Sequence, residues 1–203
     1  MKTATLFSAL LLMAILAGCG GGGGDGTSLT LTSEPALDGS ISPGDPFGLT
    51  GGYTTTEAED YIGDTAASGS RKIFLSFDIS GIPVGSTIES AVLRVYQSSY
   101  NNGGYNLGAA LVDHIYFGST VTQSILDMPA LSTISDSLAT DYLEGWKQLD
   151  VTSALQNDVD NTRSYSQYRM YHLGSNDDGE YDQDGWLLGD SAINKPELVV
   201  TYH

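Results

Sequence analysis

Residues 73–96 read IFLSFDISGIPVGSTIESAVLRVY and contain two strands separated by a turn. The first half alternates with a period of two, so that one face is fully apolar: Ile73, Leu75, Phe77 and Ile79. Pro83-Val84-Gly85 then supplies a turn. A second strand is expected over Ser86 to Gln97, with Arg94 and Tyr96 facing outward if one irregularity near Ser90 is allowed.

The rest of the chain continues this β pattern. Further strands are expected over Ser28 to Thr32, Ala58 to Gly63, Leu107 to Phe117, Gln148 to Val151, Ser166 to Leu173, Trp186 to Gly189 and Glu197 to Tyr202. One short helix is expected over Thr152 to Asp160, with Asp150 or Thr152 as its cap. Many short strands with turns between them, and no alternation with helices, predict an all-β antiparallel sandwich.

The 73–96 stretch resembles the core signature of DNRLRE-type domains, a family of bacterial and archaeal carbohydrate-binding-like modules. In that pattern, a strand ending in Phe-Asp is followed by a Pro-Gly turn and a strand of the form Ala-x-Leu-x-Leu-Tyr. Two later segments agree with it, Leu149-Asp150-Val151-Thr152 before the helix and the closing strand Lys195 to Tyr202. The resemblance spans roughly Ala58 to His203. It implies a jelly-roll β-sandwich, and either glycan binding or an accessory role beside surface enzymes and adhesins.

The N-terminus has the layout of a secretory signal that ends in a lipidation site. Lys2 precedes an apolar stretch from Leu6 to Leu16, which is too short to be a membrane-spanning helix. Leu16-Ala17-Gly18-Cys19 resembles the bacterial lipobox, in which the cysteine carries the lipid. We therefore expect a signal peptide at 1–18, lipidated Cys19 with a glycine-rich tether at 19–26, and one β-sandwich domain at 27–203. The alternative is an ordinary secretory signal with an incidental cysteine.

The mature chain is strongly acidic. Without the segment that holds Lys2, it has 7 basic and 25 acidic residues, a formal charge of −18. Such a surface repels nucleic acid, and it disfavours polyanionic ligands unless a metal bridges the two. With Cys19 as the only cysteine, no disulfide holds the domain. The expected partners are the membrane, through the lipid anchor, and a glycan or surface protein. The expected location is the outer membrane or cell surface.

An acidic cluster forms the first candidate site. Asp178, Glu180, Asp182 and Asp184 alternate along the chain, and Gly185 follows the last of them. Calcium prefers six to eight oxygen ligands, and several carboxylates in one tight loop need a counter-ion. The spacing partly matches the first half of an EF-hand loop but lacks the closing glutamate. A structural Ca²⁺ site is therefore one interpretation, and an acidic, solvated hairpin loop is the other.

An aromatic and amide-rich stretch forms the second candidate site. Tyr96, Tyr100, Asn102 and Tyr105 lie within or beside the polar segment 97–106. Aromatic faces together with amides suit carbohydrate, since a pyranose presents an apolar C–H face and a rim of hydroxyls. The alternative is a loop whose tyrosines pack over the sandwich edge.

The two tryptophans are assigned separately. Trp186 alternates with Leu188, which favours a place in the core, and Trp146 fits either packing or ligand binding.

No catalytic motif is recognisable. His114, His172 and His203 lie far apart, and the adjacent Asp113 and His114 point to opposite faces of a strand. The prediction is therefore a non-enzymatic, membrane-tethered carbohydrate-binding module on the cell surface or in the periplasm. Alternatives are a structural or adhesive surface protein making protein–protein contacts and, third, a polysaccharide hydrolase or lyase.

Overall fold

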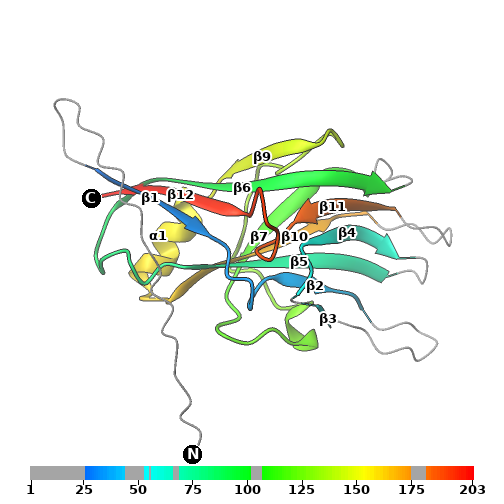
Figure 1. The fold of residues 1–203 in the computed structure, drawn as a ribbon. Coiled ribbons are helices and arrows are strands. Elements are labelled where there is room, and N and C mark those ends of the chain that lie inside the picture. The colour runs from blue at the N-terminus through cyan, green and yellow to red at the C-terminus, as the bar shows by residue number, and fades with distance from the viewer. Residues whose placement is uncertain (1–25, 44–52, 55, 66–68, 102–106, 175–181) are drawn as a thin grey trace, which may run out of the picture.

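A computed structural model describes residues 26–43, 53–54, 56–65, 69–101, 107–174 and 182–203 (Figure 1). The strands are β1 (Thr27–Thr32), β2 (Gly39–Ile41), β3 (Tyr53–Thr54), β4 (Glu59–Thr65), β5 (Gly69–Asp78), β6 (Ile88–Asn101), β7 (Ala110–Ile115), β8 (Ser132–Thr133), β9 (Gly145–Asp150), β10 (Tyr165–His172), β11 (Gln183–Leu187) and β12 (Glu197–Tyr202). The helices are the 3-10 turn η2 (Gln123–Ile125) and α1 (Thr152–Asp160). In the described part of the chain, neither helix is long and apolar enough to cross a membrane.

The strands form two antiparallel layers joined at one corner. In sheet A, the long strand β6 pairs with β9 along one edge and with β12 and then β11 along the other. β1 extends the sheet beyond β12, and β4 extends it beyond β11. In sheet B, the neighbours run in the order β3, β2, β5, β10, β7 and β8, and β4 pairs with the start of β5 to connect the layers. The expected all-β antiparallel sandwich with one short helix is confirmed.

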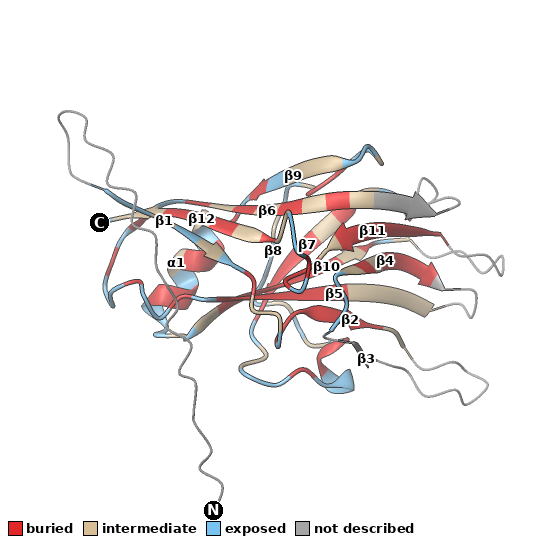
Figure 2. Cartoon of the chain, viewed as in Figure 1, coloured by how far each residue is buried: buried red, intermediate tan, exposed pale blue. Residues whose placement is uncertain are grey.

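The two strands of residues 73–96 face each other across the core. Their inner residues are buried together with those of β10, β11 and β12 (Figure 2). These inner residues include Ile73, Leu75 and Phe77 of β5, Ala91, Leu93 and Val95 of β6, Tyr168 and Met170, Trp186, and Leu198 and Val200. The pairing of β6 with β12 shifts where Thr201 faces Ser90 and Tyr202 faces Ile88. The irregularity expected near Ser90 is therefore confirmed as a bulge.

Helix α1 closes one end of the core. It begins and ends at the expected residues, and Leu155 and Val159 are buried against the sandwich. The N-cap position is Val151, so the expectation that Asp150 or Thr152 caps the helix was wrong by one residue; the carboxylate of Asp150, just before the cap, accepts the backbone N–H of Thr152 at 2.8 Å. The hydroxyl of Thr152 instead accepts the N–H of Ala91 at 2.9 Å, which ties the helix to β6.

Several strand limits differ from the expected ones. β6 continues to Asn101, four residues beyond the expected end at Gln97. β11 begins at Gln183 and ends at Leu187, whereas a strand was expected over Trp186 to Gly189. The first expectation was wrong because Ser, Asn and Gly signal a loop, and the second because carboxylates in a row signal a solvated turn. Cross-strand pairing overrides both signals.

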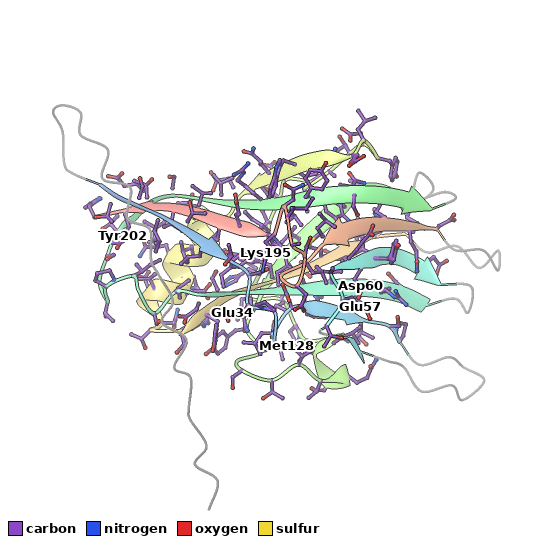
Figure 3. The ribbon with its side chains drawn as sticks, viewed as in Figure 1. Glu34, Glu57, Asp60, Met128, Lys195 and Tyr202 are labelled. Atoms are coloured by element: carbon purple, nitrogen blue, oxygen red, sulfur yellow. The ribbon has the colours of Figure 1, made fainter. Side chains whose placement is uncertain are left out.

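The outer face of sheet B is covered by the chain between β7 and β8. Ile125 and Leu126 pack there on Phe74, forming a second, smaller core. The guanidinium of Arg169 donates to the carbonyl oxygens of Leu126 at 3.1 Å and Met128 at 2.8 Å, which holds the cover in place (Met128 is labelled in Figure 3). Sheet A has no such cover over β6 and β9 in the described residues, where its outward side chains are half-buried or exposed.

Candidate functional site

Two aromatic rings form a platform on the open face of sheet A. Tyr96 on β6 lies directly opposite Trp146 on β9 in the strand register. The ring centroids are 5.6 Å apart and the planes are nearly perpendicular, at 88°. Both side chains are half-buried, and the adjacent β6 residues Val95 and Gln97 face the interior. We call Tyr96 and Trp146 the outer-face platform.

Charged neighbours fix the two rings. The Arg94 guanidinium stacks on the indole of Trp146, with its carbon 4.6 Å from the ring centroid. Glu197 on β12 holds this guanidinium through a 2.5 Å contact between Oε2 and Nη1. The hydroxyl of Tyr96 donates to Glu144 Oε1 at 3.0 Å. This hydrogen bond is the main reason that the pKa of Tyr96 is raised. The rings are therefore held at both ends before any ligand arrives.

The structure confirms two sequence expectations for aromatic residues and gives the position of Trp146. The outward direction expected for Tyr96 is confirmed, and so is the core position of Trp186, which is fully buried. The sequence left Trp146 between packing and ligand binding, and the structure places it half-buried beside Tyr96. That pairing depends on the register of β6 with β9, about fifty residues apart, which no local pattern encodes.

The described ends of the tyrosine-rich and acidic segments lie on neighbouring strands of sheet A. Tyr100, near the end of β6, pairs with Asp184 on β11 (Figure 1). These two described residues of the predicted sites are therefore neighbours, although more than eighty residues separate them in sequence. Beyond these strands, the predicted residues lie outside the described part of the chain: Asn102, Tyr105, Asp178 and Glu180, as does the predicted lipidation site Cys19.

The described half of the acidic cluster is buried. Asp182 and Asp184 are only 3% and 1% exposed, so the alternative of a solvated hairpin was wrong for these two residues. Asp184 Oδ2 lies 2.9 Å from His172 Nε2, and His172 Nδ1 lies 3.2 Å from the carbonyl oxygen of Ala109. In the described ranges, no group of three or more carboxylate, histidine or cysteine side chains is arranged to hold a metal. Asp184 therefore has a structural partner on β10.

The other central histidine is also enclosed. His114 Nε2 lies 2.8 Å from Asp158 Oδ1 on α1, and the side chains are 1% and 0% exposed. Asp113, its neighbour in β7, pairs instead with Arg169, so the expected opposite directions of Asp113 and His114 are confirmed. Both histidine–aspartate pairs connect elements of the core and present no face to a substrate.

Comparison with known proteins gives the family. The model of carbohydrate-binding module family 96 matches residues 53–202, from β3 to the end of β12. This match covers well over half of the 203 residues, so the chain belongs to carbohydrate-binding module family 96. A search of curated proteins found no match. The expectation of a carbohydrate-binding-like module is confirmed, and the family is one of non-catalytic binding modules.

Proposed function

We propose that this protein is a lipid-anchored glycan-binding protein of the outer membrane or cell surface, and that it binds its glycan at the outer-face platform. The observation that carries the binding site is the perpendicular pair Tyr96 and Trp146, fixed by Arg94 and Glu144. Two rings at this angle offer one surface for the C–H face of a pyranose and a second for its edge.

Preorganisation favours binding at this position. A ligand that stacks on mobile aromatic side chains must order them, which costs roughly 0.5–1.5 kcal/mol for each side chain. Here the stacked guanidinium and the hydrogen bond to Glu144 already restrict both rings. Exposed polar groups nearby, such as Gln148 on β9, supply hydrogen-bond partners for sugar hydroxyls.

The anchoring part of the proposal rests on the sequence Leu16-Ala17-Gly18-Cys19 and on the glycines that follow it. Acyl chains on Cys19 would insert into the membrane, and two or more chains make such attachment stable. The glycine-rich segment would then tether the sandwich close to the surface.

The test measures retention of the full chain, in detergent, on a panel of insoluble and soluble polysaccharides. Tyr96→Ala and Trp146→Ala should each weaken binding about tenfold or more, the effect typical of a buried aromatic anchor. Tyr116→Ala is the matched control, because Tyr116 is also an accessible ring with an arginine, Arg163, stacked on it. Unchanged affinity in both platform variants would refute the site, and failure of the wild type to bind any polysaccharide would refute the function.

A further inference from the structure

Strand β1 forms one edge of sheet A. Within the described residues, it pairs with β12 alone, through six consecutive residue pairs. The N–H of Ser33, just after the strand, donates to the carbonyl oxygen of Pro196 at 3.0 Å. Because backbone hydrogen bonds alternate along an antiparallel strand, Ser28, Thr30 and Thr32 direct their N–H and C=O groups away from β12. In the described part of the chain, these groups form an open row of donors and acceptors.

This edge lacks the features that usually prevent pairing between sheet edges. β1 reads TSLTLT and contains no charged residue, proline or bulge, whereas the edge strand β9 carries Lys147 and Asp150. Leu29 and Leu31 pack against the core but stay only half-buried, since no described strand lies beyond them. A further strand at this edge would pair the open backbone groups and cover both leucines.

The sequence of β1 is complementary to itself. When two copies pair antiparallel with Thr30 opposite Thr30, the outward backbone groups of Ser28 meet those of the partner's Thr32. Leu29 then lies opposite the partner's Leu31 at the positions where side chains approach most closely. On the outer face, the exposed hydroxyl side chains meet only one another. A second copy of this acidic chain can therefore pair along β1 without placing carboxylates opposite each other within the strand.

We propose that β1 is a dimerisation edge, at which two copies of this chain join their A sheets through an antiparallel β1–β1 pair centred on Thr30. Each β1 has one open edge, so the pairing closes at two copies. The twofold axis is perpendicular to the joined sheet, which keeps both outer-face platforms on the same side. β1 directly follows the glycine-rich segment 19–26, so copies anchored as proposed above would present this edge at a similar height, which raises its effective concentration.

Sedimentation of the full chain in a density-matched detergent tests the dimer. A single strand pair is a small interface, so the measurement extends to protein concentrations of about 1 mM. The wild type should show a concentration-dependent equilibrium between monomer and dimer. Added salt should favour the dimer, because it screens the repulsion between two acidic chains. A wild type that stays monomeric at every concentration and salt overturns the proposal, in favour of a different protein at this edge.

Charges placed on the twofold axis test the register. Thr30→Glu and Thr30→Lys each bring two like charges face to face, and each should raise the dissociation constant of the dimer about fivefold or more. An equimolar mixture of the two variants should restore the wild-type affinity, because opposite charges then face each other. Overall charge cannot produce this pattern, since the lysine substitution alone lowers the net negative charge. Ser132→Glu and Ser132→Lys on β8, an exposed edge strand of sheet B, are the matched controls and should leave the dimer unchanged.

The mixture also separates lost pairing from lost folding. Thr30 is exposed, so both variants should keep the fold, and recovery of the dimer on mixing requires that both chains are folded. Weakening in each variant with recovery in the mixture supports the proposal. A dimer that is insensitive to both Thr30 variants, or a mixture as weak as its components, overturns it. None of these outcomes bears on the proposed glycan binding, because the platform lies on β6 and β9.

Discussion

Replacement of Asp38 by asparagine should change how stability depends on pH. Asp38 lies between β1 and β2, is 1% exposed, and accepts the backbone N–H of Gly189 through Oδ2 at 2.8 Å. Burial raises the pKa of this carboxyl from 3.8 to about 6, and the charge of Asp190 adds to the effect. The hydrogen bond from Gly189 opposes the rise without cancelling it.

The direction and size of the change in the free energy of unfolding follow from the pKa of Asp38 in the unfolded chain, 3.8, and in the folded protein, about 6. Below pH 3.8 the Asp38 carboxyl is protonated in both the folded and the unfolded state, and its stabilising contribution to the folded state is fully present. As the pH rises through about 6, the folded state loses that contribution, because the unfolded chain ionises earlier. The total loss in the free energy of unfolding is about 3 kcal/mol, given about 1.36 kcal/mol for each unit of difference between the two pKa values. Asparagine keeps an acceptor for Gly189 and does not ionise, so its variant should escape this loss.

Thermal and urea unfolding of wild type and Asp38→Asn at pH 4 and pH 7.5 provide the measurement. Between pH 4 and pH 7.5, the free energy of unfolding of the variant should rise by about 2–3 kcal/mol relative to that of wild type. At neutral pH this corresponds to a melting temperature roughly 5–10 °C higher. Asp136→Asn removes one exposed charge and serves as the control for general repulsion on the acidic surface. Parallel pH profiles for wild type and Asp38→Asn would refute the argument from burial.

Three further predictions concern segments near the N-terminus and at the loop end of the sandwich. Cys19→Ala should leave an unlipidated precursor without stable membrane attachment, and equal detergent partitioning of both forms would count against the lipid anchor. Tyr100→Ala and Tyr105→Ala should weaken glycan retention with little change in melting temperature; a large loss of stability would instead identify them as packing residues. Calcium at a hundredfold excess over its dissociation constant should stabilise the fold by about 2.7 kcal/mol, or roughly 5–10 °C, beyond magnesium at equal ionic strength. Asp178→Asn with Glu180→Gln should abolish that difference, whereas equal shifts with both metals would indicate charge screening only.

The sequence predicted elements whose pattern is local. β5, the inner half of β6 and α1 are recognisable because their apolar residues recur at the period of the element itself. The start of β11 was missed because the partner that allows Asp184 to be buried, His172, comes from β10 and is invisible in the local pattern. The same holds for Trp146, whose role depends on strand register.

The cover over the outer face of sheet B gives the module a back and a front. Segment 117–130 and Arg169 close the back, so the described sandwich presents its ring pair in one direction only. The orientation of each copy therefore governs avidity. Neighbouring copies whose ring pairs face the same polysaccharide could bind it together, whereas a copy that turns its covered face toward the polysaccharide would add nothing to the avidity. For immobilisation or fusion, attachment through exposed residues of the cover, such as Ser124, would leave the binding front free.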